Sequence, residues 1–349
     1  MKIIYSFNKC GFEAKYWYEE ITKASNEDVL FIPFNHDKYI NPNLYIRAQL
    51  LDNLYYDKHP GLLQMYADME KLISDSKANI LLVDNAFPYH PEFLKKLSIY
   101  KVLRTTDGPI TAYDRDFAYL HAYDHILYHT PAYNEYLGMA EKLQYCGAKK
   151  INFWPLGVFD TFYDTKMTEA NILTKKRDID VVYIGSMAID KMPLLAFIKK
   201  SLGKNMRLHG LTNIKRNVYF NLKFGFPGWV KELDFEDYVP LYHRAKIGVN
   251  THLRGQFSVG NYRLFDLPAN GVMQICDGGD YLNDFFKVGK EIETYNSKEE
   301  LLDKIKYYLK NDDARNRIAL AGFKRVLQDH TMGHRLNELS KILHLDNIK

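Results

Sequence analysis

Arg263 and Asp266 are the residues whose types and spacing best suit the binding of a phosphorylated ligand. They lie three residues apart in a segment that predicts a loop, a helix over 260–270 and a buried strand, so both share one helix face. A guanidinium and the free N–H groups of a helix N-terminus attract an anion, and Asp266 is placed to accept hydrogen bonds from ribose hydroxyls. From these residues alone, an ordinary surface ion pair is the simpler interpretation, and Pro268 removes one helical hydrogen bond.

A second candidate anion site is the turn at Gly185 and Ser186, directly after the predicted strand 180–184. Glycine lets a backbone approach a phosphate, Ser186 is expected to cap the next helix, and Lys191 is expected to neutralise charge. A purely structural turn is the alternative interpretation.

Two carboxylates of the first half follow predicted strands. Asp107 stands in Thr105-Thr106-Asp107-Gly108-Pro109, after a strand over 101–104, and Asp84 follows the strand 80–83. At the carboxyl end of a parallel strand, a carboxylate faces the ligand crevice of the sheet and is placed to take a proton from a hydroxyl. The competing interpretation of Asp107 is a turn built on Asp-Gly-Pro.

Other chemical patterns are weak. Asp114-Arg115-Asp116 has the Asp-x-Asp form that binds Mg²⁺ with a diphosphate, but no buried strand runs directly into it. The sequence has no HExxH, no zinc spacing of Cys and His, no P-loop, and no GxGxxG after the first strand. We therefore predict no metal site and no cofactor.

The composition is that of an ordered globular protein. The 349 residues exceed one ordinary core, which favours two domains. The three cysteines are widely spaced, there is no signal-peptide core, and no apolar run reaches the roughly 20 residues of a membrane span. These features predict a cytoplasmic protein without a transmembrane segment. A net charge of +4, with Lys and Arg scattered among the acids, permits an anionic ligand without indicating nucleic acid.

Apolar runs alternate with amphipathic stretches in both halves, which predicts α/β domains with parallel sheets. Strands are expected over 3–7, 29–33, 80–83, 101–105, 125–129, 180–184, 206–209, 247–250 and 272–276, and helices over 14–23, 62–76, 92–99, 192–201 and from 298 almost to the end. We predict two Rossmann-like domains that face a cleft, an acceptor domain over 1–165 and a donor domain over 178–330. A last helix over 331–349 is expected to pack back on the first domain.

The segment around Arg263 resembles a motif of the CgeB-like glycosyltransferases, Asn-x-Arg-x-Phe-Glu-x-x-Ala-x-Gly. The match has Asp in place of Glu and consists of Asn261, Arg263, Phe265, Asp266, Ala269 and Gly271. The resemblance continues to His330-Thr331-Met332-Gly333-His334-Arg335 and covers most of 178–340. It implies a GT-B fold, with Arg263 on the donor diphosphate, Asp266 on the ribose, and Gly260 and Asn261 in the same donor site.

A more distant similarity is to the T-even phage DNA β-glucosyltransferase. The turn at Gly185 is similar to the Ile-Tyr-Gly-Gly-Ser turn of that enzyme, and Asp107 resembles an aspartate that is the proposed base there. The resemblance thus implies Asp107 as general base. Asp84, which follows the predicted strand 80–83, is the alternative that its position offers. Retaining relatives commonly carry an acid eight residues before the position of Asp266, which is Ser258 here, so inversion is favoured.

The function predicted from these resemblances is glycosyl transfer, an EC 2.4 reaction. The expected donor is a nucleotide diphosphate sugar, with a UDP-sugar as the guess. The expected acceptor is a hydroxyl of a glycan or surface polysaccharide, reached without a metal. The alternatives are a phage-type DNA-base glycosyltransferase and a non-catalytic nucleotide- or glycan-binding protein. Retention on DNA that weakens with salt would support the first, and an intact donor the second.

Overall fold

The computed structural model describes residues 1–9, 11–40, 48–105, 116–129, 139–252 and 260–344. The chain divides into two compact units, Met1–Leu156 with Gln256–Gly260 and Met332–Lys349, and Gly157–Gly255 with Asn261–Thr331. Among the described residues, no helix has the length and apolar character that a membrane crossing requires.

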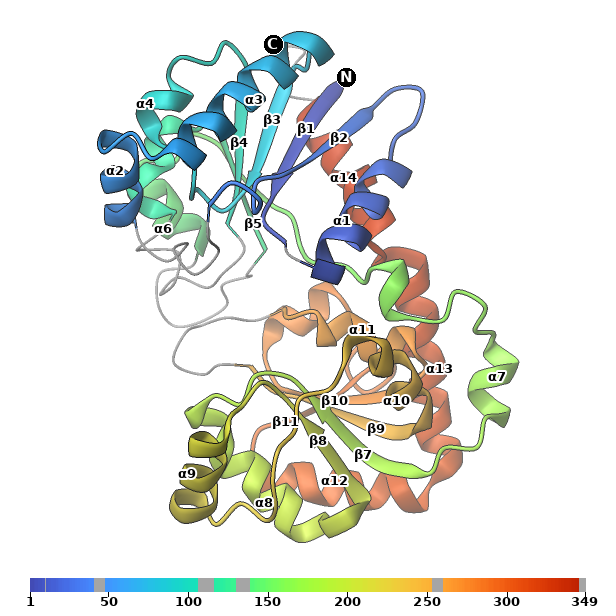
Figure 1. Cartoon of the computed structure of the whole chain (residues 1–349). Helices are drawn as coiled ribbons and strands as arrows, with labels where there is room; N and C mark the ends of the chain where they lie inside the picture. Colours follow the sequence, from blue (N-terminus) through green and yellow to red (C-terminus); the bar gives the residue numbers. More distant parts are fainter. Residues whose placement is uncertain (10, 41–47, 106–115, 130–138, 253–259, 345–349) are drawn as a thin grey trace. The chain divides into compact units, whose positions relative to one another are not determined.

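The first unit is built on a parallel sheet with the strand order β2-β1-β3-β4-β5-β6 (Figure 1). Its strands are β1 Lys2–Phe7, β2 Leu30–Asn35, β3 Ile80–Asp84, β4 Tyr100–Thr105, β5 His125–Tyr128 and β6 Ile151–Phe153. Its helices are α1 Gly11–Lys23, α2 Ala48–Tyr56, α3 Pro60–Ser76, α4 Pro91–Leu94, α6 Met139–Tyr145 and α14 Met332–His344. All five residues of β3 are buried, as expected of a central parallel strand covered on both faces.

The last helix, α14, belongs to the first unit by its contacts. Trp154 Nε1 donates to the backbone oxygen of Arg335 at 2.7 Å, and Arg335 Nε donates to the backbone oxygen of Leu156 at 2.9 Å. The helix also packs against α1. These contacts fasten the end of the described chain to the segment that follows β6.

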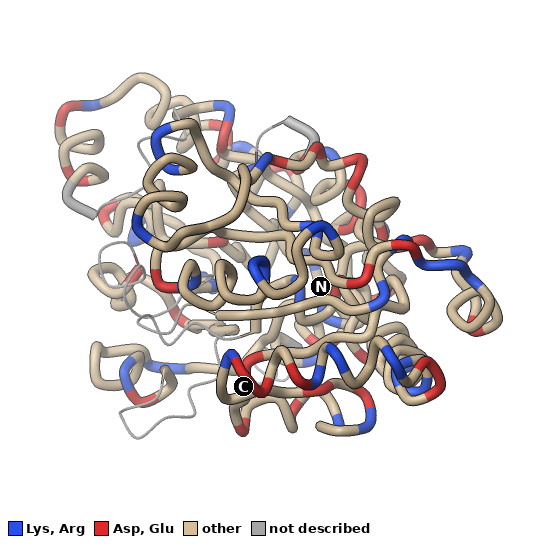
Figure 2. The backbone as a smooth tube through the Cα atoms, turned by 90° about the horizontal axis from the view of Figure 1, so that it is seen from below, with Lys and Arg blue, Asp and Glu red and all other residues tan. Residues whose placement is uncertain are grey.

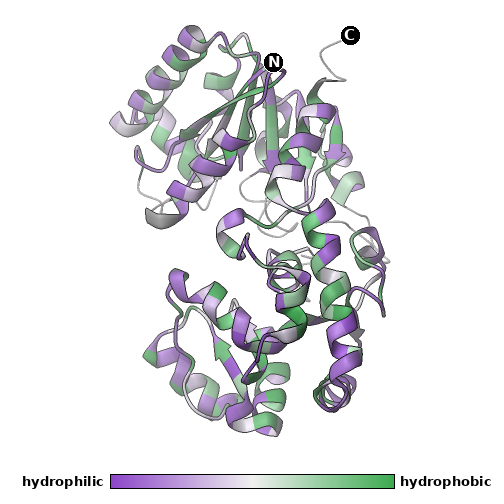
Figure 3. Cartoon of the chain, turned by 90° about the vertical axis from the view of Figure 1, so that its right-hand side faces the viewer, coloured by the Kyte–Doolittle hydropathy of each residue, from purple (hydrophilic) through white to green (hydrophobic). Residues whose placement is uncertain are grey.

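The second unit has a parallel sheet with the order β11-β10-β9-β7-β8. Its strands are β7 Ile179–Ile184, β8 Met206–His209, β9 Ala245–Asn250, β10 Met273–Asp277 and β11 Glu293–Tyr295. Its helices are α7 Glu169–Thr174, α8 Met192–Leu202, α9 Ile214–Phe224, α10 Tyr238–Arg244, α11 Arg263–Ala269, α12 Lys298–Lys310 and α13 Asp312–Asp329. The strands are mostly apolar (Figure 3), and Val181, Ile247 and Ile275 lie in one buried core with residues of α8 and α13.

Two helices are shorter in the structure than the sequence predicts. The helix expected over 92–99 is a single turn, α4, because the N–H groups of Lys96 and Leu97 form short i→i+3 turns instead of continuing it. The helix expected over 260–270 begins only at Arg263, because Gly260 has a φ of +80° and is not helical.

Candidate functional site

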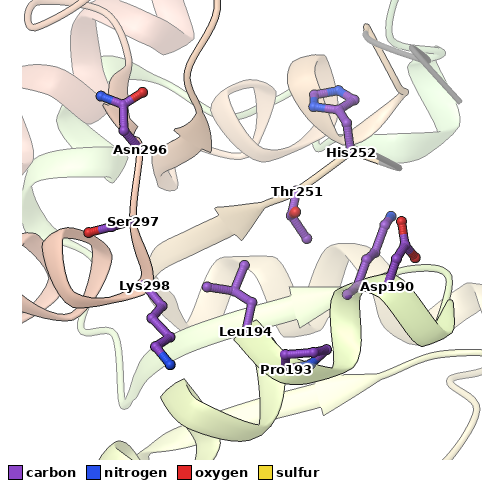
Figure 4. Close-up of a pocket in the computed structure, with 9 residues that line it drawn as sticks. Asp190, Pro193, Leu194, Thr251, His252, Asn296, Ser297 and Lys298 are labelled. Carbon is purple, nitrogen blue, oxygen red and sulfur yellow. The ribbon is translucent and has the colours of Figure 1, made fainter. Parts of the chain in front are cut away.

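A cavity of about 390 Å³ lies in the second unit, beside the carboxyl ends of three strands. Asp190, Lys191, Pro193 and Leu194 follow β7, Thr251 and His252 follow β9, and Asn296, Ser297 and Lys298 follow β11 (Figure 4). Ligands of open parallel α/β sheets bind at this edge, and the volume is within the usual range for small-molecule sites.

Lys191 is the buried cation of this cavity, with 5% of its surface exposed. Within the described part of the chain, no carboxylate lies close enough to form an ion pair with its ammonium. Burial, and next repulsion by Arg263, lower the pKa of Lys191 from 10.5 to about 8, against an opposing effect of Asp190. An unpaired, buried ammonium is unfavourable in the free protein, and a bound anion would offset that cost.

Arg263 joins the ends of two neighbouring strands. Its Nη1 donates to the backbone oxygen of Ile184 at 2.9 Å, its Nη2 to that of Thr251 at 3.2 Å, and its Nε to Asn250 Oδ1 at 3.2 Å. The guanidinium carbon also lies 5.1 Å from the centre of the Tyr183 ring. Arg263 therefore has a structural role in addition to any contact with a ligand.

Gly185 is required by Arg263. A Cβ atom at position 185 would lie 1.6 Å from Arg263 Nη1, so any other residue would displace the guanidinium. The structure thus provides a reason for this glycine that the sequence did not reveal. The expected capping role of Ser186 is wrong, because a 3-10 turn at Ile189–Lys191 intervenes, and α8 starts at Met192 without a side-chain cap.

Asn261 holds the start of α11. Its amide exchanges two hydrogen bonds with Asn250, at 2.9 and 3.2 Å, and its Oδ1 also accepts the N–H of Leu264 at 3.2 Å. This pairing connects the loop that contains Gly260 to β9. None of Gly185, Ser186, Gly260, Asn261, Arg263 and Asp266 lines the cavity, and Lys191 is the predicted donor residue that does.

Asp266 is buried, with 5% of its surface exposed. Its Oδ1 has no hydrogen-bond partner among the described residues. Burial raises the pKa of this carboxyl well above its usual range, although Arg263 acts in the opposite direction. A buried carboxyl with a free oxygen has unused capacity to bond a hydroxyl, and its predicted role at a ribose stays a prediction.

His252 and Asp277 form a pair that the sequence reasoning missed. The backbone N–H of His252 donates to Asp277 Oδ2, and the ring Nδ1 of His252 lies in hydrogen-bond contact with Asp277 Oδ1, both at 2.7 Å. Since His252 Nε2 accepts the N–H of Asn261 at 3.4 Å, the neutral ring carries its proton on Nδ1. The sequence did contain a signal for this pair, because His252 and Asp277 follow the predicted strands 247–250 and 272–276 closely.

Cys276 lies beside this pair and completes a set of three potential metal ligands. One ligand atom from each of His252, Cys276 and Asp277 lies within 4.8 Å of the others. Asp277 Oδ1 accepts hydrogen bonds from His252 and, at 3.4 Å, from the Cys276 thiol. Burial raises the pKa of the Cys276 thiol well above its usual range. The set as arranged is a hydrogen-bonded cluster.

Residues 193–341 match a protein-family model described as glycosyl transferase-like. This part of the chain is similar to glycosyltransferases. The match confirms the predicted enzyme class and includes the motif around Arg263. No curated protein matches the sequence.

Solved structures share the fold of the chain over nearly its whole length. HepE of Anabaena in complex with UDP has 11% identity and a TM-score of 0.59, over 99% of this chain and 100% of that chain. Sucrose-phosphate synthase of Thermosynechococcus elongatus has 10% identity and a TM-score of 0.62, over 99% and 98%. A glycosyltransferase of Rickettsia africae has 12% identity and a TM-score of 0.58, over 98% and 97%. The predicted GT-B fold is confirmed.

The other predicted acids belong to the first half of the chain. Asp107 and Asp114 lie outside the described residues. Asp84, at the end of β3, is 4% exposed, and its Oδ1 accepts hydrogen bonds from Tyr5 and Arg104 at 3.1 and 3.3 Å. Burial raises the pKa of Asp84, while Arg104 counteracts this effect. Asp116 is buried and accepts the N–H of Ala86 at 2.8 Å, which fixes the turn after β3.

Proposed function

We propose that the chain transfers a glycosyl group from a nucleotide diphosphate sugar to a hydroxyl acceptor. The observation that carries the proposal is Lys191, a buried ammonium without a carboxylate partner in the described structure, on the wall of a cavity at the carboxyl edge of a parallel sheet. The first turn of α8 adjoins the same cavity through Pro193 and Leu194, and its N-terminus has no side-chain cap. Both features attract a diphosphate.

The nucleotide is proposed to be UDP, because Anabaena HepE, which shares the fold, is solved with UDP and with UDP-glucose. Lys191 would meet the diphosphate directly. The guanidinium of Arg263 is held between β7 and β9, close enough to Lys191 to lower the pKa of that ammonium. Arg263 would therefore add to the positive electrostatic potential at the diphosphate. Asp266 is proposed to bind the ribose and Asp107 to be the base of an inverting, metal-independent reaction on a glycan hydroxyl. A cytoplasmic location also stays a prediction.

A donor screen tests this function. The purified chain is incubated with UDP-sugars and other nucleotide sugars, and release of the nucleoside diphosphate is measured with and without glycan acceptors. We expect release with at least one donor and an increase with an acceptor. Intact donors throughout, despite measurable nucleotide binding, would instead support a binding protein. Transfer to DNA, with retention that weakens steeply with salt, would support the DNA-modifying alternative.

A further inference from the structure

Helix α9 of the second unit carries apolar residues on its outer side. Ile214, Val218 and Leu222 follow one another at intervals of four, so they form one stripe, and 72%, 43% and 82% of their surfaces are exposed. Tyr219 on the same helix, and Leu211 just before it, are also exposed. An apolar patch of this extent on a folded domain usually marks an interaction site.

The fold uses the opposite side of this helix. Phe220 is buried in the core of the second unit, and Asn217 is buried beside it. The helix packs against α8 and lies at the periphery of its unit (Figure 1). The outer stripe therefore contributes nothing to the core of the described structure.

Trp229 is exposed on a loop that α9 holds in place. Asn217 exchanges two hydrogen bonds with the backbone of Val230, at 2.8 and 3.1 Å. Asn221 Nδ2 donates to the backbone oxygens of Phe226 and Gly228, both at 2.9 Å. These bonds fix the loop on both sides of Trp229, whose side chain is 55% exposed.

The segment that carries this patch is basic, and acidic residues resume directly after it at Glu232 and Asp234. Acidic and basic residues are interspersed along most of the chain (Figure 2), and their totals, 43 and 47, are nearly equal. Residues 192–231, however, contain no Asp or Glu. The cations of this stretch are Lys199, Lys200, Lys204, Arg207, Lys215, Arg216, Lys223 and Lys231.

We propose that α9 and the loop of Trp229 bind the surface of an anionic lipid bilayer. An interfacial helix of this kind buries an aliphatic stripe at the level of the headgroups, while flanking lysines contact lipid phosphates. Trp and Tyr are the aromatic residues that favour that depth. A nucleic acid would bind through base stacking on aromatic side chains and through contacts of cations with its phosphates, so the three exposed aliphatic side chains would have no partner in such a complex. This inference goes beyond the proposed function and does not depend on it.

The chain contains its own reporter for the test. Its other two tryptophans, Trp17 and Trp154, are buried, so a blue shift of emission on adding vesicles reports Trp229. The full chain is titrated with phosphatidylcholine vesicles and with vesicles that also contain phosphatidylglycerol. We expect binding and a blue shift with the anionic vesicles, weakened by high salt.

Variants of the patch identify the surface. Ile214→Ser and Leu222→Ser should each lower vesicle affinity roughly tenfold. Lys215→Gln and Lys223→Gln should each lower it about fivefold. The matched control is Leu63→Ser on α3, which replaces an exposed leucine of the first unit and should bind vesicles like wild type.

Thermal unfolding followed by circular dichroism serves as the measure of folding, so the test does not require nucleotide binding. Serine variants that unfold at the wild-type temperature and keep vesicle binding would overturn the proposal. So would equal binding to neutral and anionic vesicles. The patch would instead join two copies of the chain if the wild type does not bind vesicles and sediments as a dimer, and if Leu222→Ser sediments as a monomer.

Discussion

Lys191→Met removes the charge from the cavity wall while keeping a long, unbranched side chain. Folding lowers the pKa of Lys191 from 10.5 to about 8, and 1.36 kcal/mol per pH unit converts this difference to about 3 kcal/mol against the charged form. At pH 7 the wild type bears this cost and the variant does not. We therefore expect Lys191→Met to raise the free energy of unfolding at pH 7, by up to about 3 kcal/mol.

The sign of the pH dependence follows from the same pKa. Between pH 8 and 10.5 the unfolded chain holds the Lys191 proton and the folded chain does not, so this group makes the wild type more stable as pH rises. Affinity for UDP should change in the other direction. It should be level up to about pH 8, where Lys191 is charged, and fall above it by at most tenfold per pH unit.

Lys191→Met should bind UDP roughly ten- to a hundredfold more weakly at pH 7, as expected for one lost charge-assisted contact. It should also lose the decline above pH 8, because the ammonium that titrates in this range is absent from the variant. Calorimetric titration with UDP from pH 7 to 9.5 and urea unfolding at pH 7 measure both effects, with exposed Lys204→Met as the control. Wild-type affinity in Lys191→Met would refute the reasoning.

Four further changes test the rest of the site. Arg263→Ala should weaken UDP binding roughly ten- to a hundredfold. Because the variant also loses three hydrogen bonds, its free energy of unfolding, measured in urea, should fall by about 3 kcal/mol. Unchanged UDP affinity in calorimetry would contradict the assignment of Arg263 to the donor site. Asp266→Ala should weaken UDP binding but leave pyrophosphate binding unchanged, and equal losses for the two ligands would exclude a ribose contact. Asp107→Asn should bind UDP normally and turn over about 10²–10⁴-fold more slowly; near-normal turnover would direct the search for the base to Asp84. Glycosyl transfer should persist in EDTA, and a loss that Mn²⁺ restores would show that a metal is required.

Strands were the part of the fold that the sequence predicted best, because buried parallel strands are continuous apolar runs. The run at 80–83 corresponds to β3 Ile80–Asp84. The short strand β11 was missed, because Glu293-Thr294-Tyr295 is too brief and too polar for such a run. The helix around Arg263 was placed three residues too early, because the sequence pattern does not show that Gly260 has a positive φ.

The site was predicted as separate motifs, and the contacts between them were not. Alternation of strands and helices gives a parallel sheet but not its order, so it does not show that β10, β9 and β7 are neighbours. That order places His252 beside Asp277 and lets Arg263 reach the end of β7. Residue type suggested Lys191 and Arg263 as candidates for anion binding, and these roles stay predictions. The contacts that each of them makes depend on the fold and were not predicted.

The close approach of Arg263 to position 185 limits how the protein can evolve. A side chain at 185 and the guanidinium of 263 compete for one volume, because the added Cβ would lie 1.6 Å from Nη1. A residue other than glycine at 185 would force the guanidinium of Arg263 away from its present partners, whereas a lineage that replaces the arginine releases position 185 to other residues. Positions 185 and 263 should therefore covary among homologues, although they are far apart in the sequence.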